Sequence, residues 1–197
     1  MPANPPLVLA SSSPRRRALL EQIGIRPGRI ATPEIDETPL PRELPRAHAL
    51  RLAETKLTAV ASRPDAAGAF VLGADTVVAC GRRILPKTDD AASAERCLRL
   101  LSGRRHRVYT GVALAAPDGA RAARVAMTVV RFKRLGAEEL AAYLASGEWQ
   151  GKAGGYAIQG RAEAFVVAIN GSYSNVVGLP LQVTWDLLRG LGWRIDG

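Results

Sequence analysis

The sequence predicts an α/β fold built on a mixed β-sheet, and three observations carry this prediction. Short apolar runs typical of buried strands alternate along the chain with stretches of helical periodicity. One pair of strand-like runs is joined by the turn signal Pro117-Asp118-Gly119, which indicates an antiparallel pair. With 197 residues, 47% of them hydrophobic, the chain is long enough for a buried core. We therefore expect one folded domain over residues 1–197.

The first half of the chain is predicted to alternate strands with helices. Ser13 is a good N-cap and Pro14 fits the first helical position, so a helix is expected to begin here and to end at Gly24. Residues 26–45 are rich in proline and acidic residues, which indicates an irregular connection. The other predicted elements are a strand over residues 7–10, a helix over 48–62 and a buried strand over 70–80.

The second half adds the antiparallel pair and three more helices. The helix at residues 90–101 is expected to begin at Asp89 or Asp90 and to end at Gly103. Pro180 predicts the start of the last helix. The remaining elements are strands over 108–115 and 124–132, a helix over 137–146, a glycine-rich loop over 147–160, a strand over 164–169 and a helix over 181–188.

Two classes of protein are disfavoured by composition. No apolar run approaches the roughly 20 residues of a membrane-spanning helix, and the basic cluster at residues 15–17 follows an apolar run instead of preceding it, unlike a secretory signal. Cys80 and Cys97 lack the spacing of a zinc site or a disulfide framework and are expected to be packing residues. We therefore expect a cytoplasmic protein with no membrane contact.

The charged residues are strongly biased towards arginine. The net charge is +9, and the 27 basic residues comprise 23 arginines and four lysines. With such a bias, a filler position would have become arginine, so each remaining lysine is informative. Lys133 adjoins Arg131 and Arg134 and is expected on the surface, whereas the other three lie near polar loops: Lys56, Lys87 and Lys152.

The junction Ser11-Ser12-Ser13-Pro14-Arg15-Arg16-Arg17 is the first candidate site. A helix N-terminus offers unpaired N–H groups, and arginine side chains can grip phosphate oxygens in bidentate fashion. Three arginines in the first turn oppose the helix dipole unless an anion lies there. A solvated basic turn with an ordinary Ser-Pro cap explains the same residues about equally well.

Asp75 is the second candidate, since it lies in the middle of an apolar strand. Burying an acid there is costly unless the carboxylate is paired with a cation or bound to a metal. Asp75 is therefore either a functional group or part of a structural ion pair, and we favour the functional interpretation. Gly73 would allow a ligand or another segment to approach closely. Asp36 and Glu37 could add carboxylate oxygens, although alone they read as solvated loop acids.

Together these features favour a polyphosphate ligand. Fixed cations stabilise charge on phosphoryl oxygens, and a carboxylate can orient or deprotonate a water molecule. The glycine-rich loop matches neither the P-loop nor the dinucleotide fingerprint. Any metal here would be a hard ion held by oxygen atoms.

Longer motifs resemble a known family. LVLASSSPRR, RLAETK, VLGADTVV, LLSGRRHRVYTGVAL, KAGGYAIQG and FVVAINGSYSNVVGLPL follow in the order and at the spacing of Maf-type nucleoside triphosphate pyrophosphatases, from end to end of the chain. The resemblance implies a fold like that of inosine triphosphate pyrophosphatases, with an elongated twisted sheet, flanking helices and two lobes around a cleft. It also implies hydrolysis between the α and β phosphates with Mg²⁺ or Mn²⁺.

The resemblance is greatest to the subgroup that acts on dTTP and UTP. Its three specificity positions correspond to Arg15, Thr76 and Gln159, and the Trp, Gln and Glu of the subgroup acting on 7-methyl-GTP are absent there. The resemblance makes Asp75 the proton acceptor and implies an acidic metal site of Asp36, Glu37 and Asp75. The implied contacts to substrate phosphates or the metal site are Ser11, Ser13, Arg15, Arg16, Lys56, Lys87 and Lys152.

Two departures from the family pattern touch the substrate cleft. Pro86-Lys87-Thr88 stands where the family usually has Gly-Lys-Pro, and Ala162-Glu163 replaces a Gly-Gly pair found in many members. Because of them, the sequence defines the reaction better than it defines the preferred nucleotide, for which modified pyrimidine nucleotides and 7-methyl-GTP stay open. The sequence also leaves the oligomeric state open, and a homodimer is one of the alternatives.

Two other functions compete with this one. The net charge alone would fit a nucleic-acid-binding protein, but such proteins gather their cations on one stripe or tail, often with aromatic residues. Here arginines are scattered and aromatic residues are only 5%, so no stable nucleic-acid complex is expected. A regulator of a protein partner is the other alternative, because the family has been linked to septum formation.

Overall fold

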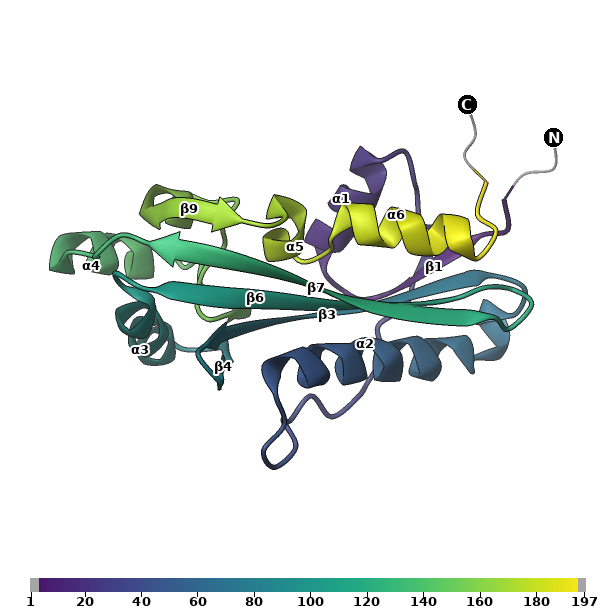
Figure 1. Ribbon diagram of the computed structural model, residues 1–197, viewed down its shortest axis with the longest axis horizontal. Coiled ribbons are helices and arrows are strands. Elements are labelled where there is room, and N and C mark those ends of the chain that lie inside the picture. Colours follow the sequence, from purple (N-terminus) through teal and green to yellow (C-terminus); the bar gives the residue numbers. More distant parts are fainter. Residues whose placement is uncertain (1–3, 195–197) are drawn as a thin grey trace.

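A seven-stranded mixed sheet runs along the molecule in the computed structural model, which describes residues 4–194 (Figure 1). Its strand order is β2-β1-β3-β6-β7-β9, with β4 beside β3. Among the strands of residues 4–194, only the pairs of β1 with β2 and β3 are parallel, so the sheet is mixed as predicted. The strands are β1 (Leu7–Ala10), β2 (Arg29–Ile30), β3 (Phe70–Cys80), β4 (Arg83–Leu85), β6 (Arg105–Ala115), β7 (Arg121–Phe132) and β9 (Val166–Asn170); β5 (Lys87–Thr88) and β8 (Lys152–Ala153) form a separate ribbon.

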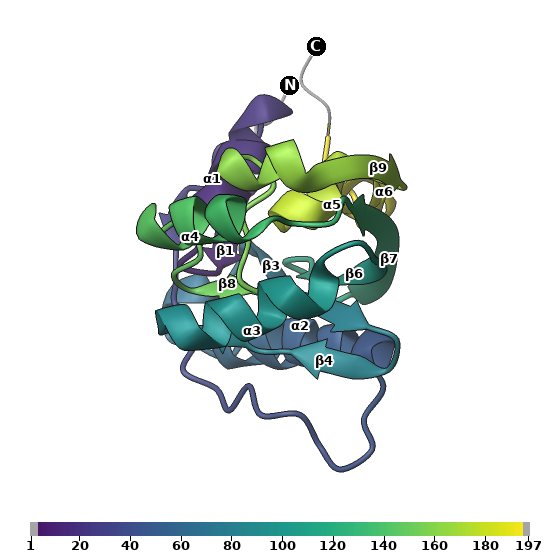
Figure 2. The same ribbon diagram turned by 90° about the vertical axis from the view of Figure 1, so that its left-hand side faces the viewer.

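Helices cover both faces of the sheet and one of its ends. In Figure 1, α2 lies below the sheet, α1, α5 and α6 lie above it, and α3 and α4 gather at the left-hand end. Figure 2 looks onto that end, with α3 and α4 in front. No helix within the described part is long and apolar enough to cross a membrane. The helices are α1 (Pro14–Gln22), α2 (Pro45–Ala61), α3 (Ala91–Leu101), α4 (Ala137–Ala145), α5 (Tyr173–Val177) and α6 (Leu181–Gly190).

The buried core is divided between the two ends of the sheet. At the α3–α4 end it centres on aromatic and aliphatic side chains such as Phe132, Tyr143 and Leu98. At the other end, Leu20, Leu72 and Leu188 pack between α1, α6 and the sheet. A third cluster lies between α2 and the opposite face of this same end of the sheet. The core therefore forms two lobes joined by the long strands β3, β6 and β7.

Two glycines allow α2 to lie directly on the sheet. A Cβ added to Gly111 would stand 2.2 Å from the carbonyl oxygen of Ala49, and one added to Gly73 would stand 2.4 Å from that of Ala53. Both distances are shorter than any van der Waals contact, so only glycine permits this approach. The contact fixes Lys56 of α2 beside the middle of β3.

The predicted elements agree with the structure in type, and they differ at ends and in short segments. Asp90 is the N-cap of α3, accepting a hydrogen bond from Ser93 N, whereas the N-cap Ser13 makes no side-chain capping bond. α2, β6 and β7 each begin three residues before the predicted start. The elements that were not predicted are each of two to five residues: β2, β4, β5, β8, α5 and two 3-10 helices, Pro64–Ala66 and Arg161–Phe165. Such short segments contain too little periodicity to be recognised.

His106 on β6 is a buried base with an incomplete set of hydrogen bonds. Its Nε2 lies 2.8 Å from the Tyr156 hydroxyl, while Nδ1 has no partner among the described residues. Burial disfavours the imidazolium and lowers the pKa of His106 to about 4 from its ordinary 6.5. The folded protein therefore binds fewer protons than the unfolded chain between these two values.

We expect this difference to make stability depend on pH. Stability attributable to neutral His106 is complete above pH 6.5 and is lost as pH falls towards 4, by up to about 3 kcal/mol. Urea unfolding at several pH values measures the loss. The His106→Gln variant keeps an amide for Tyr156 but does not titrate, so its stability should change less between pH 6.5 and 4.5. An equally steep loss in the variant would show that other groups cause it.

Candidate active site

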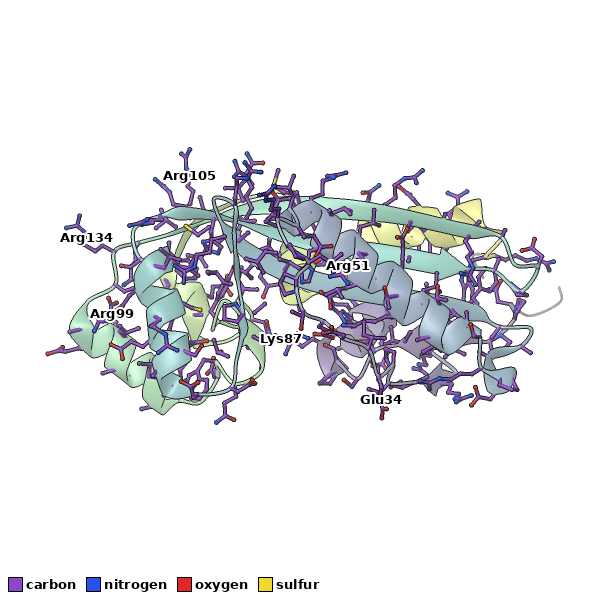
Figure 3. The ribbon with its side chains drawn as sticks, turned by 90° about the horizontal axis from the view of Figure 1, so that it is seen from below. Glu34, Arg51, Lys87, Arg99, Arg105 and Arg134 are labelled. Carbon is purple, nitrogen blue, oxygen red and sulfur yellow. The ribbon has the colours of Figure 1, made fainter. Side chains whose placement is uncertain are left out.

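A cleft of about 360 Å³ lies between the two lobes. Its walls come from the start of α1, the loop after β2, α2, β3, the β5–β8 ribbon, residues 156–159 and α5. Figure 3 shows Lys87 between the lobes and Arg51 on α2. Eleven of the twelve predicted site residues line this cleft: Ser11, Ser13, Arg15, Arg16, Glu37, Lys56, Asp75, Thr76, Lys87, Lys152 and Gln159.

An ion-pair cluster forms the floor of the cleft. Lys56 Nζ donates to Asp75 Oδ1 at 2.5 Å and lies 2.6 Å from Glu37 Oε1. Lys87 pairs with the other oxygen of Glu37. Lys56 and Asp75 are 6% and 3% exposed, so each buried charge is compensated by its neighbour. The cluster connects α2, β3, the β5–β8 ribbon and the loop of residues 31–44, which hangs below the sheet in Figure 2.

Glu37 is held as a carboxylate by its two lysines. Its burial favours the neutral acid, but hydrogen bonds from Lys56 and Lys87 outweigh burial and lower the pKa of Glu37 to about 2. Glu37 therefore stays charged throughout the physiological range.

Asp75 retains one free oxygen. Oδ1 accepts the hydrogen bond from Lys56, while Oδ2 accepts none from residues 4–194. Because Asp75 lines the cleft, a water molecule there could donate a proton to Oδ2. The buried acid is thus both an ion-pair partner and an available base, so the two interpretations of Asp75 in the sequence are compatible.

Arg16 is a buried cation without a carboxylate partner in the described chain. It is 8% exposed, and its guanidinium donates to Gly178 O at 2.9 Å and to Ser11 Oγ at 2.8 Å. Burial lowers the pKa of Arg16, and the nearby charge of Asp75 opposes this effect. Arg15 is half-buried and donates to Val177 O. The start of α1 therefore presents fixed positive charge to the cleft, which favours the anion-binding interpretation over a solvated turn.

The opposite wall carries Lys152 and Gln159. Lys152 lies on β8, and its Nζ donates to Gln150 O at 2.8 Å. Gln159 is exposed on a segment whose two sides are tied to the protein. On one side Ala157 N donates to the Tyr143 hydroxyl at 3.2 Å, and on the other Arg161 N donates to Glu148 Oε2 at 2.8 Å. These bonds fix the backbone that carries the Gln159 amide.

The carboxylates suit a metal ion that arrives with phosphate ligands. No group of three or more His, Cys, Asp or Glu side chains within residues 4–194 could hold a metal by itself. Glu37 and Asp75, however, both face the cleft, and Mg²⁺ is commonly held by one or two carboxylates together with substrate phosphates. Asp36 does not line the cleft. Its Oδ1 accepts from Thr38 N at 2.8 Å and stabilises the loop.

Several residues of the site were not predicted from sequence. Tyr156 is the aromatic residue that lines the cleft. An aromatic residue in a glycine-rich loop is a feature by which the sequence could have indicated it. Thr110 and Asn175 are fully buried beneath Thr76. A threonine in a strand is ordinary, so no pattern in the sequence marks Thr110.

The arrangement suits a polyanion and a hydrolytic reaction. The lining holds five cations, namely Arg15, Arg16, Lys56, Lys87 and Lys152, against two carboxylates, which leaves a net charge of +3. Fixed cations in such a cleft stabilise charge that develops on phosphoryl oxygens. Asp75 supplies a base within the same space.

Comparison with known proteins found relatives in sequence and similar solved structures. A dTTP/UTP pyrophosphatase of Paramagnetospirillum magneticum is 63% identical over 95% of this chain and 97% of the relative. A dTTP/UTP pyrophosphatase of Caulobacter vibrioides is 59% identical over 98% of this chain and 100% of the relative. Among solved structures, a nucleoside-triphosphatase / dITP/XTP pyrophosphatase of Mycobacterium abscessus aligns with 66% of this chain and 76% of its own, at 21% identity and a TM-score of 0.41. The family model described as Maf-like protein matches residues 6–191.

Proposed function

The chain belongs to the Maf-like protein family, and from this premise we propose that it is a dTTP/UTP pyrophosphatase, a hydrolase of nucleotide metabolism. The proposed reaction converts the triphosphate to the nucleoside monophosphate and pyrophosphate. Relatives of that name share 55–63% identity with the chain over nearly its full length. The observation that carries the proposal is the free Oδ2 of buried Asp75 beside a group of fixed cations.

The proposed mechanism uses the cleft residues in distinct roles. Arg15, Arg16 and the start of α1 bind the triphosphate on one wall, and Lys87 and Lys152 bind it on the other. Asp75 Oδ2 accepts a proton from the water that attacks the α-phosphorus. The bond between this phosphorus and the α–β bridging oxygen breaks, and pyrophosphate leaves with that oxygen.

Glu37 and Asp75 are the residues that would hold a divalent cation, Mg²⁺ or Mn²⁺. The ion would neutralise phosphate oxygens and so favour both binding and attack. Lys56 holds these two carboxylates close together through its contacts with both. Asp36 was also predicted as a metal ligand, but it would affect the metal site only indirectly, by stabilising the loop that carries Glu37.

We assign recognition of the base chiefly to Gln159. Its amide offers one acceptor and two donors, which match the N3–H and O4 groups shared by uracil and thymine. Thr76 is the second residue that the family resemblance assigns to the base. The proposal further includes a cytoplasmic location and no stable nucleic-acid complex.

A nucleotide panel tests the reaction. Pyrophosphate release should be fastest with dTTP and UTP, slower with CTP and GTP, and should disappear when a chelator removes divalent cations. Orthophosphate should form only after a separate inorganic pyrophosphatase is added. Faster hydrolysis of 7-methyl-GTP than of dTTP and UTP would place the chain in the subgroup that acts on 7-methyl-GTP. Direct release of orthophosphate would refute cleavage between the α and β phosphates.

A further inference from the structure

We propose that Thr76 and Thr110 are positioning residues that hold Arg16 for the substrate phosphates. This inference rests on the proposed function, because it assigns a phosphate ligand to Arg16. It concerns a set of buried hydroxyl groups that connects the cleft to the interior of the sheet. Three steps lead from the guanidinium of Arg16 to the backbone of α5.

The first step is the attachment of Arg16 itself. Its Nε donates to Gly178 O at 2.9 Å, Nη1 to Ser11 Oγ at 2.8 Å and Nη2 to Thr76 Oγ1 at 3.3 Å. A guanidinium has five N–H donors, so one donor remains on each terminal nitrogen. These free donors on both terminal nitrogens allow the guanidinium to bind phosphate oxygens. The three bonds come from separate segments and fix the plane of the group.

The second step is the Thr76 hydroxyl, whose single proton is used within the protein. Besides the bond from Arg16, its oxygen lies 3.0 Å from Thr110 Oγ1 and 3.3 Å from Gly178 O. A hydroxyl has one proton to donate and two lone pairs. Thr110 Oγ1 and Gly178 O therefore share the one proton of Thr76, with Thr110 the nearer acceptor, while a lone pair of Thr76 accepts the bond from Arg16.

The third step gives the hydrogen bonds a direction. Thr110 lies directly opposite Thr76 in the register of β3 and β6, and it is fully buried. Thr110 donates its proton to Asn175 O at 3.1 Å, so it accepts from Thr76, which in turn accepts from Arg16. Asn175 is held in place because its side-chain amide donates to Val108 O and to Thr128 Oγ1.

This arrangement explains how uncharged oxygen atoms stabilise the buried cation. No carboxylate among residues 4–194 lies within 4.0 Å of Arg16, so its charge is met by oxygen dipoles and by the more distant Asp75. A cation desolvated in this way is pre-organised for an anion. Loss of the Thr76 acceptor would leave one buried donor unpaired and would let the guanidinium rotate.

The test uses inorganic triphosphate, which has no base. Titration calorimetry with the full chain should show about tenfold weaker binding for Thr76→Val and Thr110→Val, and near wild-type binding for Thr76→Ser. Thr184→Val is the matched control, because Thr184 is also fully buried but donates to Pro180 O within α6. Unchanged triphosphate binding in both valine variants would overturn the proposal, whether or not the wild type hydrolyses nucleotides.

Steady-state kinetics add a second readout that a merely structural defect would not produce. Both valine variants should lower kcat/KM for dTTP, UTP, CTP and 7-methyl-GTP by one common factor, so that the ratios between nucleotides stay the same. A changed ratio between pyrimidine and purine nucleotides in Thr76→Val, with Thr110→Val unaffected, would show that Thr76 reads the base. If Thr110→Val fails to fold, Thr110→Ala provides the same loss of hydroxyl with less steric demand.

Discussion

Asp75→Asn should lower kcat by about 10³-fold and leave the fold intact, since general bases typically contribute 10²–10⁴-fold. The asparagine side chain has the same shape and retains an oxygen that can accept the bond from Lys56. It has no carboxylate to take a proton from water. Lys56 keeps its contact with Glu37, so its buried charge remains paired and the melting temperature should change by only a few degrees.

Single-turnover measurement of pyrophosphate release from dTTP is the appropriate assay, because it separates chemistry from product release. Asp65→Asn is the matched control: Asp65 is an exposed aspartate paired with Arg29 and does not line the cleft. Its turnover should stay within about twofold of the wild type, as expected for a surface ion pair. If Asp75→Asn retains more than a tenth of wild-type turnover, another group must be the base.

The sequence was most informative where one physical requirement dominated the choice of residue. β3 and α3 agree with prediction because long apolar periodicity and a capping aspartate specify them. The starts of β6 and β7 were missed because arginines occupy these strand positions, and an exposed strand face tolerates arginine. The short strands β5 and β8 depend on tertiary pairing, which no local pattern records.

The same distinction holds for the site. Asp75 could be identified because an acid inside an apolar strand has few explanations, and Lys56, Lys87 and Lys152 because lysine is rare in this chain. The bridging of Glu37 and Asp75 by Lys56 could not be foreseen, because it depends on how α2 lies across β3. Asp36 illustrates the reverse case, since its carboxylate stabilises its own loop while its neighbour Glu37 lines the cleft.

Gly111→Ala should be the most destabilising of the substitutions discussed, because it acts on the contact that places α2 on the sheet. The new Cβ would lie 2.2 Å from Ala49 O and 3.0 Å from Leu50 Cα, and both are backbone atoms of α2. Neither can move without the helix, so we expect a loss of about 3 kcal/mol and a melting temperature lower by roughly 6–12 °C. Turnover should fall as well, because a displaced α2 takes Lys56 away from Asp75.

Gly190→Ala is the control that separates this effect from the general consequence of adding a methyl group. Gly190 ends α6, and nothing lies within 4 Å of a Cβ added there. Alanine is the better helix former by about 1 kcal/mol, so this variant should melt at or above the wild-type temperature. Calorimetry measures the melting temperatures of both variants and of the wild type under the same conditions. Equal melting temperatures for Gly111→Ala and Gly190→Ala would mean that α2 can yield at Gly111, and that the close approach of helix and sheet does not hold Lys56 in the cleft.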